Sequence, residues 1–263
     1  MTDIYFDGIA EGFNTSIYNT SKGFIRLGVL WHDLCEAVPN VQQQRLRVLD
    51  VGGGMGQLAI RFAKLGHDVV LADPSEDMLA RARANIASAN LNIQTVHTSA
   101  QDLHQHVEGT FDLVLCHAVL GWVHNPADVI GILRDYVAPD GHLSLMFYNQ
   151  NAAIFKRVMQ GDMTTFRSPD AAKEVAQAGP QTSDIPEFAG ARALQLETIT
   201  RYLEDADLQI QHKAGIRIFH DHIPEDVRES VLEALLEVEI NFRCTEPFAS
   251  LAQHIHLICT RAS

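Results

Sequence analysis

A glycine-rich turn between an apolar segment and a helical segment constrains the fold of this chain more than any other feature. Residues 46–56 read L-R-V-L-D-V-G-G-G-M-G, with Asp50 at the end of a predicted strand and Gly52, Gly54 and Gly56 at alternate positions. Glycine allows positive φ and lets the backbone approach a ligand closely. This order of strand, turn and helix is typical of a ligand-binding crevice in an open α/β sheet.

The next predicted strand, residues 68–72, stops on an acidic residue, Asp73. An acid at this place accepts hydrogen bonds from the two ribose hydroxyls of an adenosine cofactor. A dinucleotide-binding turn reads G-x-G-x-x-G, whereas this turn reads D-x-G-x-G-x-G. The acid before the first glycine would repel a pyrophosphate but suits the ammonium group of a methionyl moiety. The turn therefore resembles the first motif of class I S-adenosylmethionine-dependent methyltransferases and predicts that cofactor.

Composition is that of an ordinary globular protein, with 46% hydrophobic residues among 263 and a formal net charge of −13. The sequence has no apolar run of the roughly eighteen residues that a membrane helix needs. Residues 1–12 lack the features of a signal peptide, and the four cysteines show no paired spacing. A cytoplasmic location is therefore expected. The acidic charge means that any nucleic-acid substrate must be bound by a local basic patch.

Strand and helix patterns alternate after residue 46, which predicts an α/β fold. We expect a Rossmann-like class I methyltransferase with a seven-stranded, mostly parallel sheet and helices on both faces. The single domain, 1–263, is expected to comprise an N-terminal helical segment (1–45), a cofactor-binding core (46–148), an inserted lid (149–195) and the C-terminal half of the sheet on the substrate side (196–263). Further strands are expected at 93–97, 111–117, 142–148, 208–219 and 253–261, the last as an edge or antiparallel strand.

Capping residues mark the expected helix starts. Ser75 begins one helix, and Asn125 followed by proline begins another that ends before a Pro-Asp-Gly turn at 139–141. One helix is expected to start at Pro224 and to expose a solvated row of glutamates. The expected helices cover residues 10–31, 75–88, 125 to the turn, 196–206 and 224 onward, and the exposed row comprises Glu225, Glu229, Glu233 and Glu237.

Six short stretches give the chain a resemblance over nearly its whole length to the bacterial tRNA 5-carboxymethoxyuridine methyltransferases. They are F-D-G-I-A-E at 6–11, I-Y-N-T-S-K-G at 17–23, L-R-V-L-D-V-G-G-G-M-G-Q at 46–57, H-A-V-L-G-W at 117–122, L-S-L-M-F-Y-N at 143–149 and R-I-F-H-D at 217–221. The resemblance implies an O-methyltransferase that esterifies the oxyacetate carboxylate of a modified wobble uridine in the anticodon of tRNA.

The resemblance also implies a set of residues around S-adenosylmethionine. Arg26 suits a two-pronged contact to the methionyl carboxylate. Asp102 is expected to accept a hydrogen bond from the adenine amino group, and His117 to lie beside the sulfonium. The full expected cofactor set is Arg26, Asp50, Gly52, Gly53, Gly54, Asp73, Ala100, Gln101, Asp102 and His117.

The implied chemistry asks little of the protein besides positioning. A carboxylic acid with an ordinary pKa near ~4 is already ionised at neutral pH, so no general base and no metal are expected. Histidine pairs at 220/222 and 254/256 share one face of a strand if both segments are extended, but a metal site needs further ligands. We expect hydrogen-bonding and basic side chains to hold the carboxylate, from the set Tyr18, Lys22, Tyr148, Asn149, Arg217 and His220.

Two other functions stay open on the sequence. Residues 167–192 hold only three basic side chains, whereas a relative carries a lysine-rich lid, and Gly121 stands where relatives tend to have glutamate. A methyltransferase acting on a small organic acid or other metabolite, or a non-catalytic protein that binds S-adenosylmethionine, would share the same fold. Trp31 and Trp122 offer stacking surfaces for a base but are expected to pack in the core.

Overall fold

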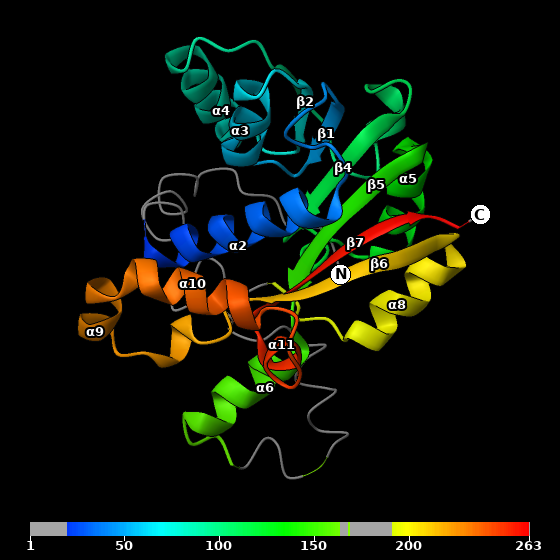
Figure 1. Ribbon diagram of the computed structural model, residues 1–263. Coiled ribbons are helices and arrows are strands. Elements are labelled where there is room, and N and C mark those ends of the chain that lie inside the picture. Colours follow the sequence, from blue (N-terminus) through cyan, green and yellow to red (C-terminus); the bar gives the residue numbers. More distant parts are fainter. Residues whose placement is uncertain (1–19, 164–167, 169–190, 263) are drawn as a thin grey trace.

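A seven-stranded sheet with the order β3-β2-β1-β4-β5-β7-β6 forms the centre of the protein (Figure 1). The computed structural model describes residues 20–163, 168 and 191–262. The strands are β1 (Arg47–Val51), β2 (Asp68–Asp73), β3 (Gln94–His97), β4 (Phe111–His117), β5 (Val137–Tyr148), β6 (Leu208–Ile216) and β7 (His254–Arg261). The predicted fold class is confirmed.

Strand direction places several chain ends at one edge of the sheet. The five strands from β3 to β5 pair in parallel, so the turn after β1 lies beside the ends of β2 and β4. β7 is antiparallel, as expected, but it lies between β5 and β6 rather than at an edge. β6 occupies that edge and ends before Arg217, because Arg217 has a φ of 61° and leaves the extended conformation.

Helices cover both faces of the sheet (Figure 1). Apolar side chains of α2, α3, α4 and α10 pack on one face. Those of α5 and α8 pack on the other. The helices are α2 (Ser21–Ala37), α3 (Gln57–Lys64), α4 (Glu76–Ser88), α5 (Pro126–Tyr136), α6 (Gln150–Met159), α8 (Leu196–Asp205), α9 (Glu225–Ser230), α10 (Leu232–Phe242) and α11 (Phe248–Leu251), with short 3-10 helices at Leu103–Gln105 and His220–His222.

The predicted turn at 139–141 is part of a strand. β5 begins at Val137, which pairs with Phe111, and its register with β4 then shifts so that His142 pairs with Leu113. The extra residues form a bulge, where a proline without an N–H costs no ladder hydrogen bond. Gly141 is required there, because a Cβ would lie 2.8 Å from the Phe111 carbonyl oxygen.

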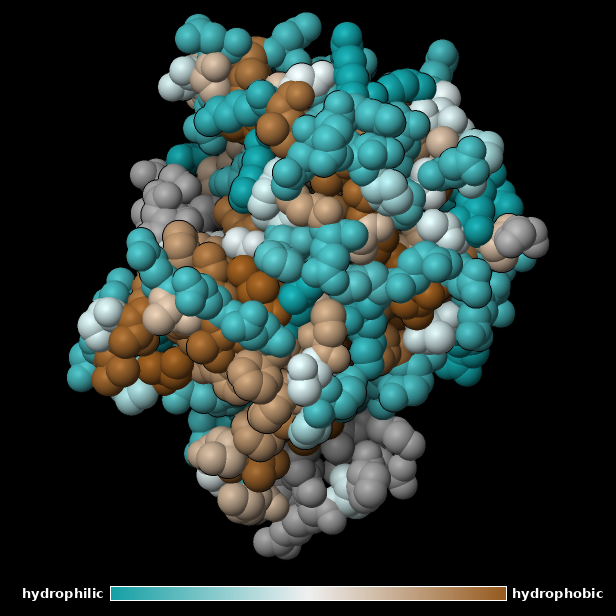
Figure 2. Space-filling view, in the orientation of Figure 1, coloured by the Kyte–Doolittle hydropathy of each residue, from teal (hydrophilic) through white to brown (hydrophobic). Residues whose placement is uncertain are grey.

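The single helix expected from Pro224 is two helices, α9 and α10, separated at Val231. The Ser230 hydroxyl donates to the Val227 carbonyl at 2.7 Å, a local bond that competes with helix continuation. Figure 2 shows hydrophobic surface over these helices, where Val227 and Val231 are exposed. The predicted glutamate row is confirmed as exposed along its whole length.

The segment expected to be a lid begins with a regular helix, α6. Asn149 caps it by accepting a hydrogen bond from the Asn151 N–H at 3.1 Å. Residues 164–167 and 169–190 lie outside the described residues, as do residues 1–19, which include the first ten residues of the helix expected at 10–31. The lid and the other domain boundaries stay predictions. In the parts of the chain that the structure describes, no helix is both long and apolar enough to span a membrane.

Candidate active site

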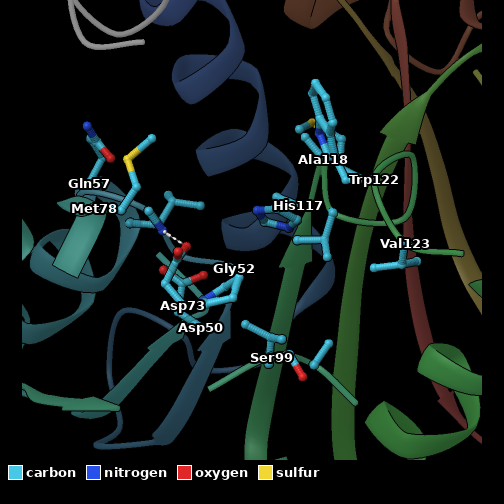
Figure 3. A pocket seen from close by; sticks show the side chains of 18 of the residues that line it. Asp50, Gly52, Gln57, Asp73, Met78, Ser99, His117, Ala118, Trp122 and Val123 are labelled. Atoms are coloured by element: carbon cyan, nitrogen blue, oxygen red, sulfur yellow. Dashed lines mark hydrogen bonds between the residues drawn. The ribbon is translucent and has the colours of Figure 1, made fainter. Parts of the chain in front are cut away.

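A cavity of about 1060 Å³, measured with the solvent at its mouth, opens at the carboxyl ends of β1, β2 and β4. This is the crevice where ligands bind in open α/β sheets. Its walls are the glycine turn, the end of β2, the loop after β3, the segment 117–123 and one side of α2 (Figure 3).

The glycine turn leaves no room for side chains. Gly52 and Gly54 have positive φ values of 67° and 55°. A Cβ on Gly52 would clash with the side chain of Val119, and a Cβ on Gly53 would lie 2.8 Å from the Asp50 carboxyl group. The turn therefore brings bare backbone to the cavity wall, as the sequence predicts.

Two buried carboxyl groups lie beside this turn. Asp73 accepts hydrogen bonds from the backbone N–H groups of Gly54 and Ser75, both at 2.9 Å, and Figure 3 shows the first of them. Asp50 lines the same wall, and burial, together with the negative charge of Asp73, raises the pKa of its carboxyl group to about 7. The cavity thus carries acceptors suited to hydroxyl groups and to a cation.

Two other lining residues carry polar atoms that a ligand could satisfy. The buried Gln57 Oε1 and His117 Nδ1 atoms have no hydrogen-bond partner among the described residues. Buried polar atoms of this kind are normally satisfied. Figure 3 shows the His117 ring between Gly52 on one side and Ala118 and Trp122 on the other.

The loop after β3 contributes part of the expected set. Ala100 and Gln101 line the cavity together with Ser99. Asp102 does not: it is exposed, accepts a hydrogen bond from the Ser99 hydroxyl at 2.8 Å and another from the Gln105 amide at 3.1 Å. The structure therefore does not bring Asp102 to the cavity wall. Arg26, by contrast, reaches the cavity from α2.

The expected substrate-binding residues are only partly gathered at this cavity. Tyr148 lines it. Asn149 does not, because its amide group donates to the carbonyl oxygens of Ser250 and Ala252 at 2.9 and 2.8 Å while its oxygen caps α6. Lys22 is on α2 but outside the cavity lining, and Tyr18 lies outside the described residues.

Arg217 lines a second, smaller cavity with Lys156 and His222. Its guanidinium group forms an ion pair with the Asp221 carboxylate. His220 is fully buried, with its Nδ1 2.7 Å from Asp221 and its Nε2 3.1 Å from the Ser21 hydroxyl. These contacts make His220 a structural support rather than a wall of either cavity.

One buried acid in this region was missed in the sequence. Glu239 on α10 accepts hydrogen bonds from the backbone N–H groups of Ile218, Phe219 and His220 at 2.7–2.9 Å, and so holds the loop that carries Arg217. The detectable signal was a glutamate one turn after Leu235, on the apolar face of the helix rather than in the exposed row.

The expectations for the His220/His222 pair and for the two tryptophans have different outcomes. The His220/His222 pair lies on a 3-10 helix and not on a strand. Trp31 packs edge-on against Phe62, with ring centroids 5.4 Å apart, as expected for a core residue. Trp122 is largely buried but lines the cavity.

Comparison with known proteins decides the family. The family model described as a methyltransferase domain matches residues 48–141. The tRNA 5-carboxymethoxyuridine methyltransferase of Escherichia coli (strain K12) is 38% identical over 260 residues, which cover 98% of this chain and 96% of the relative. The chain belongs to the tRNA 5-carboxymethoxyuridine methyltransferase family.

Solved structures confirm the fold of this family member. Magnesium protoporphyrin IX methyltransferase from Synechocystis PCC 6803, with bound SAH, superposes with a TM-score of 0.63 at 16% identity and covers 98% of this chain and 97% of its own. An S-adenosylmethionine-dependent methyltransferase from Mesorhizobium loti gives 0.60 at 19% identity, covering 89% and 98%. The protein is an S-adenosylmethionine-dependent methyltransferase.

We propose that the cavity holds the cofactor with the residues that line it. The closely packed turn at Gly52 and Gly53, the unpartnered atoms of Gln57 and His117, and the acceptors of the two aspartates all fit a cationic nucleoside. In this proposal Asp73 binds the ribose, and the Ser99–Gln101 loop borders the adenine. Arg26 pairs with the methionyl carboxylate, and Asp50 lies toward the ammonium group.

The raised pKa of Asp50 makes cofactor affinity depend on pH. Its carboxyl group titrates near 7 in the free protein, and a bound ammonium group favours the ionised form. Affinity for S-adenosylhomocysteine is therefore expected to rise about fivefold from pH 6 to 7 and about twofold more above pH 7, because below pH 7 binding must first release a proton. Calorimetry across this range measures the slope. Asp50→Asn should flatten it, and an equal slope in both proteins would contradict the assignment.

Proposed function

We propose that this protein transfers a methyl group to the carboxylate of 5-carboxymethoxyuridine at the wobble position of tRNA, giving the methyl ester. The observation that carries the proposal is the 38% identity over 98% of the chain to an enzyme named for that nucleoside. The chemistry of the cavity is consistent with it, since a carboxylate needs alignment and exclusion of water rather than a base.

When bound, S-adenosylmethionine supplies a methyl group on a positively charged sulfur. The residues of the chain then have to hold a carboxylate beside it. Tyr148 is suited to donate to that group, because burial raises the pKa of its hydroxyl even though Arg26 and Arg217 oppose the shift. The hydroxyl therefore keeps its hydrogen at neutral pH.

Tyr148 also links the larger cavity electrostatically to a residue of the smaller one. It lines the larger one, while the charge of Arg217, a lining residue of the smaller one, acts on its hydroxyl. In the proposal, the nucleoside enters past this side chain, with Arg217 and Lys156 supplying the local positive charge for an otherwise acidic protein. A charged hydrogen bond of this kind contributes about 1.5–3 kcal/mol.

The test is methyl transfer from labelled S-adenosylmethionine to tRNA of a strain that lacks the ester but keeps the carboxylate. Label should enter that tRNA, appear in the modified nucleoside after digestion and be released by mild alkali, as an ester is. Transcribed tRNA without the modification is the control and should accept none. Label on the unmodified transcript would place the target elsewhere. Label on free carboxylic acids, with none on tRNA, would select the small-molecule alternative.

A further inference from the structure

Four buried or half-buried polar residues form a chain of hydrogen bonds. The chain runs from the cavity, along the sheet face that α2 covers, to an acid of α2. His117 Nε2 is 2.8 Å from the Ser144 hydroxyl, which is 2.8 Å from His256 Nε2. His256 Nδ1 is in turn 2.7 Å from Asp33 Oδ2. We call these residues, Asp33, His256, Ser144 and His117, the relay.

Strand register explains how the relay is assembled. Met146 of β5 pairs with His117 of β4 on one side and with His256 of β7 on the other. Ser144 lies two residues earlier on β5, so its side chain points to the same face and fits between the two imidazoles. The rings are 5.7 Å apart and nearly perpendicular. Helix α2 brings Asp33 onto this face.

The acid at the far end sets the direction of the hydrogen bonds. Asp33 is fully buried and ionised, since bonds from His212 and His256 hold the pKa of its carboxyl group well below the usual range against the effect of burial. An ionised carboxylate only accepts, so His256 Nδ1 donates. Arg243 donates both to Asp33, at 2.7 Å, and to Glu36, and the assignment of the hydrogens takes the fully buried His256 as neutral.

The remaining links follow from a neutral His256. Its Nε2 then accepts from the Ser144 O–H, and the Ser144 oxygen accepts from the Nε2–H of His117. His117 Nδ1 is left without hydrogen. A protonated His256 would reverse both links and put the hydrogen on Nδ1 instead.

We propose that the relay holds His117 as the neutral tautomer with hydrogen on Nε2, so that the buried Nδ1 of this cavity-lining residue carries no hydrogen. Asp33, His256 and Ser144 are then positioning residues, acting through His117. The groups that face the two imidazoles are Asp33 and Arg26 of α2, His212 of β6, and Arg243 after α10, with Glu36 beside that arginine.

A neutral acceptor here serves a cationic cofactor in two ways. It avoids the repulsion that an imidazolium would exert on a sulfonium or an ammonium group, and it offers a lone pair in a wall where Nδ1 has no described partner. Burial, with His256 and Arg26, also lowers the pKa of His117 well below its usual value, in agreement with a ring that stays neutral.

Imidazole ¹⁵N spectra of the histidine-labelled protein, without substrate, test the tautomer. The His117 signals, assigned by their loss in His117→Gln, should show a pyrrole-like Nε2 and a pyridine-like Nδ1 that do not change between pH 6 and 8. Hydrogen on Nδ1, or titration within this range, would overturn the proposal. This test uses the unmodified protein and needs only His117→Gln to fold, so it is decisive even if the Asp33, Ser144 or His256 variants do not, and it is independent of the identity of the methyl acceptor.

Ser144→Ala tests the relay itself, because it removes the middle link with the loss of a single heavy atom. The His117 nitrogen shifts should then move toward the average of two tautomers, and affinity for S-adenosylhomocysteine should fall roughly two- to twelvefold, the effect of one hydrogen bond. Ser144→Thr keeps the hydroxyl and should restore the wild-type spectrum. Unchanged nitrogen shifts in Ser144→Ala would show that the relay does not set the tautomer.

Discussion

Replacing Asp73 with alanine is expected to weaken S-adenosylmethionine binding by about thirtyfold or more, or about 2 kcal/mol. The Asp73 carboxylate accepts the backbone N–H groups of Gly54 and Ser75, one on each oxygen, and in the proposal the same carboxylate binds the ribose hydroxyls. The variant thus loses the proposed ribose contacts and an acceptor that holds the glycine turn in place. Calorimetric titration with the cofactor or with S-adenosylhomocysteine measures the change.

Asp68 provides a matched control at the opposite end of the same strand. Its exposed carboxylate pairs with Arg45, far from the cavity lining, so Asp68→Ala should leave cofactor affinity within about twofold. Thermal unfolding of both variants separates lost binding from lost stability. If Asp73→Ala folds and binds the cofactor as tightly as the unmodified protein, the ribose assignment is wrong.

The part of the cavity wall that we assign to the cofactor was predictable because it is local in sequence. The glycine turn follows β1 directly, Asp73 ends β2, and His117 ends β4, so three strand ends that the apolar pattern reveals are the same ends that parallel pairing brings together. Strand limits there were correct to within about a residue. The positive φ values at 52 and 54 favour glycine there, so such a motif can be recognised from the sequence.

The substrate side was less predictable because its contacts join distant parts of the chain. Asn149 looked available at a strand end, but its amide binds carbonyl groups about a hundred residues later. Glu239 of α10 and Asp33 of α2 bind groups on the sheet and on the loop after β6. The local sequence pattern does not predict these long-range contacts. The position of Asp102 was also not predictable from its place after β3. A local hydrogen bond from the Ser99 hydroxyl keeps its side chain away from the cavity.

The second large effect is expected from Arg217, whose removal should reduce kcat/KM on tRNA by about thirtyfold or more while cofactor affinity changes less than about twofold. The magnitude is that of a charged hydrogen bond lost from the proposed carboxylate grip. Arg217 has the positive φ of 61° that strained functional positions show, and its buried Nε has no partner among the described residues.

The simple variant Arg217→Ala is not sufficient, because it would leave a buried carboxylate unpaired. Although burial raises it, the charge of Arg217 and bonds from His220 and Arg217 hold the pKa of Asp221 well below its usual range, and loss of such a partner costs about 3–5 kcal/mol of stability. The double variant Arg217→Gln with Asp221→Asn removes both charges and keeps a polar side chain at each position. Asp221→Asn alone keeps the arginine and is its matched control.

Steady-state kinetics on carboxylate-bearing tRNA should therefore rank the proteins in a definite order. The unmodified protein and Asp221→Asn should differ by no more than about fivefold, whereas the double variant should fall well below both, with calorimetry showing normal cofactor binding in all three. Asp221 holds the guanidinium group and lines the smaller cavity beside it, so Asp221→Asn measures how far turnover depends on this acid while Arg217 is kept. Equal turnover of the double variant and Asp221→Asn would remove Arg217 from the substrate site and return attention to Tyr148 and Lys156.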